Sequence, residues 1–167
     1  DLKQNRSYRP IGWDYTHVIN RLYHLSRYSC PDISRAVQYL WSEPQNVSAA
    51  ISAIRYLKGT KDKGVTFKPS NQFDIKMYMD TSWEPDRDAS LGISNPSYGY
   101  ITYLAGCPLF WFSQQQTWLP QSGTQFDYTN LCLGRDAMYE LKSSLYDLFN
   151  DLGVSLTLPI KCIAYLS

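Results

Sequence analysis

The stretch that decides the fold lies near the middle of the chain and reads Asp74-Ile75-Lys76-Met77-Tyr78-Met79-Asp80. Apolar and polar side chains alternate along it, which is the pattern of a β-strand with one face in a hydrophobic core. The predicted strand ends on an acid, Asp80. A carboxylate at a strand end can project beyond the sheet, where oxygen ligands could hold a cation such as Mg²⁺.

Further strands and one long helix are predicted after this strand. Residues 98–104 and 109–112 are rich in aromatic and β-branched side chains, and Ala105-Gly106-Cys107-Pro108 between them is typical of a hairpin turn. Residues 124–152 fit a long helix, and residues 158–165 fit a last strand. The residues expected to face inward from the long helix are Leu131, Met138, Leu141, Leu145 and Leu148.

The part of the chain before about residue 68 predicts a compact cluster of short helices. Pro31 and Asp32 separate a first helix from a second, Pro44 ends the second, and Gly59 is a natural end for a third. Asn46 or Ser48 begins the third helix. The residues expected on the inward faces are Val18, Ile19, Leu22 and Leu25, then Ile33, Ala36, Val37, Leu40 and Trp41, then Val47, Ala50, Ile51, Ile54 and Leu57.

The composition is that of a folded domain with balanced charge. Of the 167 residues, 44% are hydrophobic and 19% are charged, which supports a packed core and excludes wholesale disorder. Sixteen Lys and Arg residues balance 15 Asp and Glu residues, so the net charge is +1. This balance argues against a strongly basic nucleic-acid arm and against a polybasic membrane surface, although it allows a local basic groove.

The four cysteines and the apolar runs predict an intracellular location. Cys30, Cys107, Cys132 and Cys162 are far apart, with no CxxC pair and no zinc-ligand spacing, so they are expected to be thiols in a reducing compartment. No apolar run reaches the roughly 18 to 20 residues of a membrane span, and the first residues show no signal-peptide pattern. No membrane association is therefore expected.

Five blocks of the sequence, in the same order and at compatible spacing, resemble the Pol polyproteins of copia-type LTR retrotransposons. Residues 29–37 are similar to the family's TRPDIxYAV block, and residues 53–60 are nearly its RILRYLKGT. Residues 78–83 resemble YSDADW, residues 98–113 resemble SGYVFFLGGGPISWKSKKQ, and residues 122–128 resemble SSTEAEY. Together the blocks cover roughly residues 8 to 165.

The resemblance implies two pieces of a Pol polyprotein. Residues 1–68 would be the end of a reverse transcriptase, its helical thumb or connection region. Residues 69–167 would be an RNase H-like domain, truncated after its fourth strand. The implied fold class is α+β or α/β: a small helical segment, then a mixed sheet with one long helix packed on it. The paired aspartates of a polymerase active site, usually YxDD, do not occur in the sequence.

The acidic site that the resemblance implies is incomplete. The family's core metal ligands are Asp, Glu and Asp, with a fourth acid further on. Asp80 matches the first, Asp127 stands at the Glu position, and Gln125 replaces the other motif Glu. In the CDN motif, Cys162 is followed by Ile163, so the third acid is replaced by an aliphatic side chain, and the fourth acid does not occur in the sequence. Two acids cannot neutralise two divalent cations, so no metal cofactor is expected.

The favoured hypothesis is a non-catalytic protein, a degenerate or host-adopted retrotransposon remnant that acts as an interaction or scaffolding module. An uncovered sheet edge and an exposed apolar helix face would bind a protein partner or a second copy of the chain. The many Tyr and Trp side chains fit a contact surface, and core packing explains them equally well.

Two alternatives remain open. The chain could be a ribonuclease that cuts RNA in RNA–DNA hybrids, with Mg²⁺ or Mn²⁺ on Asp80 and Asp127. The missing acids would then come from another chain or from Glu84, Asp86 or Asp88. It could instead bind nucleic acid without cutting it. The basic residues that would contact a phosphate backbone are Arg55, Lys58, Lys61 and Lys63.

Overall fold

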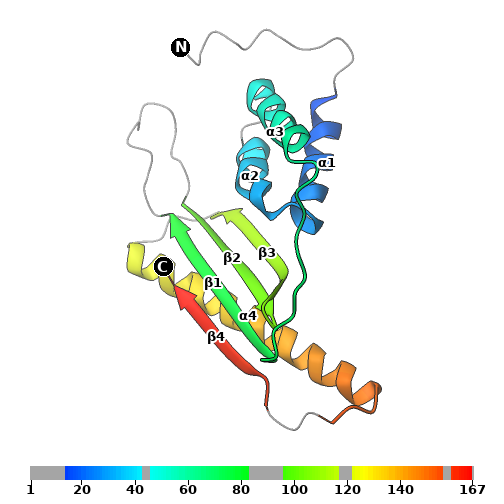
Figure 1. Cartoon of the computed structure of the whole chain (residues 1–167). Helices are drawn as coiled ribbons and strands as arrows, with labels where there is room; N and C mark the ends of the chain where they lie inside the picture. The colour runs from blue at the N-terminus through cyan, green and yellow to red at the C-terminus, as the bar shows by residue number, and fades with distance from the viewer. Residues whose placement is uncertain (1–13, 43–45, 83–95, 117–121, 156–158, 167) are drawn as a thin grey trace. The chain divides into compact units, whose positions relative to one another are not determined.

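The computed structural model describes residues 14–42, 46–82, 96–116, 122–155 and 159–166. The chain divides into two compact units, Asp1–Val65 and Thr66–Ser167. The first runs from blue to green in Figure 1 and its described elements are helical, and the second holds the sheet and the long helix. The assignment of residues 1–68 and 69–167 to two pieces of a polymerase polyprotein stays a prediction.

The first unit is a cluster of short helices, as the sequence predicts. Its elements are α1 (Tyr15–Tyr28), the 3₁₀ turn η2 (Pro31–Ile33), α2 (Ser34–Ser42) and α3 (Val47–Gly59). Two helices begin at side-chain caps, because Asp14 accepts a hydrogen bond from the backbone N–H of His17 (3.2 Å) and Asn46 accepts one from that of Ala49 (3.1 Å). The buried core residues are Ile19, Leu22, Ile33, Val37, Leu40, Ala50 and Ala53.

Several side chains expected to face inward on these helices are exposed. Leu25 is 37%, Trp41 is 58% and Ile54 is 39% exposed. In α1 the inward stripe continues to Ser26 instead of Leu25, because the helix is rotated so that Ile19, Leu22 and Ser26 share the buried face. In α3 the small side chains of Ala50 and Ala53 are the buried ones instead, and small residues let helices approach closely.

The second unit is a four-stranded mixed sheet with the order β3-β2-β1-β4. The strands are β1 (Asp74–Ser82), β2 (Ser97–Leu104), β3 (Cys107–Gln115) and β4 (Lys161–Leu166). β1 pairs antiparallel with β2, β2 pairs antiparallel with β3, and β4 joins β1 in parallel. The predicted hairpin turn is present: Ala105 and Gly106 adopt positive φ angles of 50° and 80° between β2 and β3.

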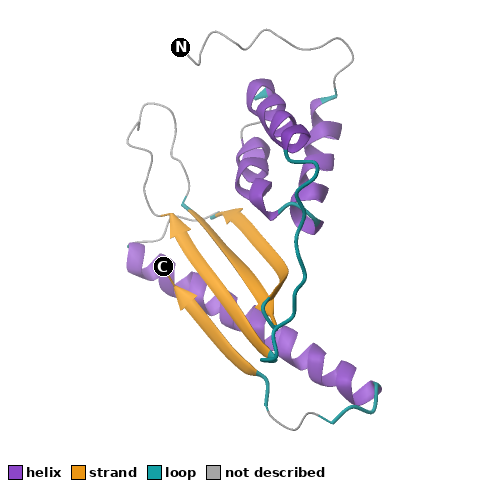
Figure 2. Cartoon of the chain, viewed as in Figure 1, coloured by secondary structure: helices purple, strands orange, loops and turns teal. Residues whose placement is uncertain are grey.

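The helix α4 (Gly123–Asp151) covers one face of this sheet, behind the strands in Figures 1 and 2. Its start is capped by Ser122, which accepts a hydrogen bond from the backbone N–H of Gln125 (3.1 Å). The packed core between helix and sheet contains Ile75, Met77, Met79, Met138 and Ile160, with Tyr100, Leu104, Phe110, Leu131, Leu141 and Leu145 around it. Leu148, expected inward, is 51% exposed because it lies in the last turns of α4.

The predicted α+β architecture is therefore confirmed, and it is compatible with an RNase H-like domain. The sequence predicts the last strand over residues 158–165, whereas β4 covers Lys161–Leu166. No helix in the described parts of the chain is long and apolar enough to cross a membrane. The intracellular location stays a prediction.

Gly134 is a point where α4 approaches β1 closely. A Cβ atom added there would lie 2.3 Å from the sulfur of Met79 and 2.9 Å from that of Met77, which is closer than van der Waals contact allows. Glycine at this position therefore lets the helix backbone rest on the two methionine side chains.

We expect Gly134→Val to lower the free energy of unfolding by about 2 kcal/mol, because the added side chain overpacks the interface. Urea denaturation followed by circular dichroism measures it. The matched control is Gly59→Val at the end of α3, where an added Cβ would have no atom within 4 Å. A Gly134→Val protein as stable as the control would contradict the close approach.

Candidate acidic site at the end of β1

Along β1, buried residues alternate with more exposed ones, so the strand has a buried face and an accessible face. Ile75, Met77 and Met79 are buried against α4, so we call this side the helix face. Lys76, Tyr78 and Asp80 occupy the opposite side, which we call the outer face. In the described part of the second unit α4 is the only helix, so no described helix of this unit covers the outer face. Asp80 is accordingly exposed.

A side chain of β1 that is hydrogen-bonded to Asp127 is that of Thr81. Thr81 follows Asp80 and lies on the helix face, where its hydroxyl donates a hydrogen bond to the Asp127 carboxylate at the start of α4. The carboxylate of Asp80 accepts a hydrogen bond from the backbone N–H of Thr81 (2.9 Å). Because neighbouring residues of a strand alternate, Asp80 starts from the outer face of β1, whereas Asp127 is bonded at the helix face.

Asn130 ties the same part of α4 to β1, and no sequence motif singles it out. Its side chain is 1% exposed, and its amide N–H donates to the backbone carbonyl of Asp80 (3.3 Å). The amide oxygen of Asn130 has no hydrogen-bond partner among the described residues. The only sequence signal for this role is a polar residue one turn after Asp127, on the side of the helix that carries Phe126 and Met138 into the core.

The neighbours of Asp80 on the outer face add no second carboxylate from the described strands. On β2 its partner is Gly99, which has no side chain. On β4, Ile163 pairs with Lys76, four residues before Asp80, so it lies about 13 Å along the strand at about 3.3 Å per residue. The register thus does not place the residue matched to the third acid beside Asp80. The possible substitutes Glu84, Asp86 and Asp88 lie outside the described residues.

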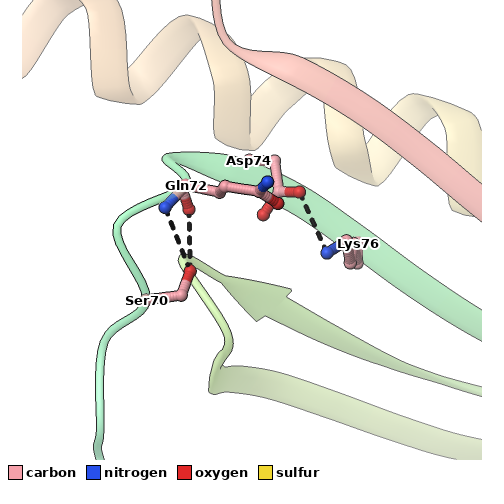
Figure 3. Close-up of polar contacts among 4 residues, drawn as sticks. All are labelled: Ser70, Gln72, Asp74 and Lys76. Carbon is pink, nitrogen blue, oxygen red and sulfur yellow. Dashed lines mark hydrogen bonds and ion pairs between the residues drawn. The ribbon is translucent and has the colours of Figure 1, made fainter.

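A further acid, Asp74, lies at the opposite end of β1 and is already paired. Its carboxylate forms an ion pair with Lys76 (3.0 Å), and this hydrogen-bonded contact raises the pKa of Lys76 (Figure 3). The same figure shows the Ser70 hydroxyl bonded to the backbone of Gln72 where the chain enters the strand. Asp74 is six residues from Asp80, or about 20 Å along an extended strand, so the two cannot bind one cation.

The described residues contain no group of three or more His, Cys, Asp or Glu side chains that could hold a metal ion. The exposed cysteine on β4, Cys162, is close enough to Lys142 of α4 to feel its charge. Desolvation raises the pKa of the Cys162 thiol, while Lys142 lowers it, and the net shift is upward. Hydrogen bonds join α4 to the end of β1.

Comparison with known proteins agrees with the sequence motifs. The chain is 29% identical over 151 residues, 87% of its length, to the retrovirus-related Pol polyprotein from transposon RE1 of Arabidopsis thaliana. It is 28% identical over 155 residues to that from transposon RE2 of the same plant. It is also 27% identical over 120 residues to a putative transposon Ty5-1 protein of Saccharomyces cerevisiae. No family model and no solved structure matches the chain.

These similarities confirm the resemblance of the chain to the Pol polyproteins of copia-type retrotransposons. It spans 10% of the length of the RE1 and RE2 polyproteins and 38% of the Ty5-1 protein.

We expect Thr81→Asp to create the carboxylate pair that the natural sequence lacks. The new acid would lie beside Asp127 on the helix face, where the two like charges repel unless a cation lies between them. Mn²⁺ should therefore raise the thermal midpoint of this variant by several degrees, because ligand binding stabilises the folded state.

The control for this experiment is Thr81→Asn, which has nearly the same size and no charge. Mn²⁺ should leave the thermal midpoints of Thr81→Asn and of the natural chain within about 1 °C, since neither has two acids together. An equal Mn²⁺ shift in the natural chain would show that Asp80 and Asp127 already share a site.

Proposed function

We propose that this chain is a non-catalytic, RNase H-like interaction module of retrotransposon origin. Its relatives support a retrotransposon-derived RNase H and reverse-transcriptase region, and its α+β fold is compatible with that origin. The observation that carries the non-catalytic part is the separation of Asp80 from Asp127 by the alternation of β1. Metal-dependent phosphodiester hydrolysis needs acids that converge on cations about 3.5 to 4 Å apart.

The contact between Thr81 and Asp127 strengthens this proposal. The Thr81 hydroxyl donates a hydrogen bond to a carboxylate oxygen of Asp127, and this oxygen would be needed to bind a metal ion. Binding a cation through that oxygen would first break this bond. No metal cofactor is needed for the proposed role, whereas Mg²⁺ or Mn²⁺ would be required by the nuclease alternative.

An interaction role is supported by the outer face of the sheet. Tyr78 is 45% and Tyr165 is 43% exposed, and their rings stack with centroids 4.8 Å apart and planes 10° apart. Tyr103 meets the Tyr78 ring edge-on at 5.8 Å. This row of aromatic rings is fixed by mutual contacts, so little side-chain entropy would be given up on binding a partner. Exposed, ordered tyrosines of this kind are frequent in protein interfaces.

We expect the chain to cleave no RNA–DNA hybrid above background with either Mg²⁺ or Mn²⁺. The assay follows a labelled RNA strand, and it compares the natural chain with Asp80→Asn and with a triple variant, Glu84→Gln, Asp86→Asn and Asp88→Asn. All three proteins should give the same background rate. Metal-dependent cleavage that Asp80→Asn or the triple variant abolishes would establish the nuclease instead.

Nucleic-acid binding without cleavage is the second candidate, and the distribution of charge supports it. Residues 1–65 hold ten of the 16 Lys and Arg residues and five of the 15 acids, whereas residues 66–167 hold the other six and ten. The helical unit is therefore basic, although the whole chain is nearly neutral. The four basic residues at the end of α3 and just after it are all exposed: Arg55, Lys58, Lys61 and Lys63.

If this second candidate is right, binding of a fluorescent hybrid duplex should weaken steeply with salt, because Lys and Arg release counterions from the phosphates. Replacing Arg55, Lys58, Lys61 and Lys63 with Gln should reduce the slope of log K against log salt by roughly one for each phosphate that is no longer bound. The control replaces Lys68, Lys76, Lys142 and Lys161 of the sheet unit with Gln. If both variants bound the duplex equally weakly, the binding would reflect non-specific electrostatic attraction and not a site at the end of α3.

A further inference from the structure

The helix α1 has a buried face in the core of the helical unit and a chemically different face on its opposite side. The buried residues are Ile19, Leu22 and Ser26. A second row of residues follows the helix in steps of four, three and four positions, so its members are neighbours on one face. This row, which we call the α1 row, consists of His17, Arg21, His24 and Tyr28, and all four are exposed.

The α1 row combines positive charge with aromatic rings. The helix contains no Asp or Glu between Tyr15 and Tyr28, and Arg21 is always protonated. The whole unit is basic, because residues 1–65 hold ten Lys and Arg residues and five acids. A complementary ligand carries negative charge and flat groups that stack on aromatic rings, and nucleic acid has both.

Arg21 is oriented by its neighbour in the row, His17. The Nε–H group of Arg21 donates a hydrogen bond to Nε2 of His17 (2.7 Å). An imidazole nitrogen that accepts a hydrogen bond carries no proton, so the pair contributes one positive charge. The bond uses Nε alone. The two Nη groups of the guanidinium are not part of it, and their N–H groups can bind a phosphate.

Tyr28 is the aromatic end of the α1 row. It is 74% exposed, and its ring centroid lies 4.7 Å from that of His24 with the planes 44° apart. The contact with His24 restricts the Tyr28 side chain, while most of the Tyr28 surface stays accessible. Stacking of a base on such a ring contributes to binding whatever the sequence. An unpaired base offers its face for this contact, whereas bases in a duplex are stacked on each other.

We propose that the α1 row binds single-stranded nucleic acid, with an unpaired base stacked on Tyr28 and a nearby backbone phosphate bound by Arg21. The two residues are seven positions apart, or about 10 Å along the helix at about 1.5 Å per residue. This distance corresponds to roughly three nucleotides at the spacing of about 3.4 Å along one strand. The inference goes beyond the proposed interaction role, and its site differs from the duplex contact considered at the end of α3.

Fluorescence anisotropy with a labelled oligothymidylate tests the binding, because a strand of thymidine alone forms no duplex with itself. Tyr28→Leu should weaken the binding at least about five-fold, which is the lower end of the effect of losing one stacked base. Tyr28→Trp should retain it. The matched control is Tyr39→Leu, which removes an exposed tyrosine of α2 in the same unit and should leave the affinity unchanged. Circular dichroism of each variant checks that the helices are formed.

The dependence of binding on salt tests the role of Arg21. For single strands, each bound phosphate contributes about 0.7 to the slope of log K against log salt. Arg21→Gln should therefore reduce the slope by about 0.7, whereas Tyr28→Leu should leave the slope unchanged because it removes no charge. The control Lys68→Gln removes an exposed cation of the sheet unit and should change neither the slope nor the affinity.

A photochemical cross-link locates the stacked base. An oligonucleotide that contains iodouracil joins to an aromatic side chain in contact with the base when it is irradiated, and mass spectrometry identifies the residue. The cross-link should fall on Tyr28. Tyr28→Leu should also leave the affinity for a duplex of the same length unchanged, because a paired base does not stack on this ring.

The proposal is wrong if the natural chain does not bind oligothymidylate at low salt, or if Tyr28→Leu weakens binding no more than Tyr39→Leu does. It is also wrong if Tyr28→Leu weakens binding of the single strand and of the duplex by the same factor. A cross-link to a different residue would exclude stacking on Tyr28. None of these results depends on protein partners, so the proposed interaction role would stand or fall separately.

Discussion

The contact between α4 and β1 is the constraint on which the rest of the sheet unit depends. Gly134 brings the helix backbone onto Met77 and Met79, and this close approach decides which face of β1 is covered. Once Met77 and Met79 face the helix, the period of two in the strand sends Asp80 to the other side and Thr81 toward Asp127. The packing of Met77 and Met79 in the core thus places the Thr81 side chain beside Asp127.

The geometry around Asp80 shows features of the acidic region that the motifs alone do not show. In the sequence comparison, the missing metal ligand is at Ile163, because this aliphatic residue matches the position of the family's third acid. In the structure, Ile163 lies beside Lys76 and well before Asp80, so its identity bears little on the Asp80 carboxylate. Asp80 and Thr81, the residue that is hydrogen-bonded to Asp127, start on different faces of β1. A shift of one residue in a strand reverses the direction in which a side chain leaves it.

The surface left by this arrangement is polar at the end of β1 and aromatic along its middle. Tyr103, Tyr78 and Tyr165 form a row from β2 across β1 to β4. The net acidic composition of this unit differs from the basic composition of residues 1–65.

The sequence by itself determined the elements and the ancestry. The alternation of residues 74–80, the turn at Ala105 and Gly106 and the long apolar repeat of residues 124–152 are local patterns, and local patterns can be recognised without knowledge of what packs against them. Only the tertiary structure decided that Leu25, Trp41, Ile54 and Leu148 are exposed, since helix rotation depends on the neighbouring elements. It also decided that Thr81 holds Asp127 and that Asn130 holds the backbone of Asp80. Those bonds join residues 46 and 50 positions apart, and register between distant segments is set by the packed core.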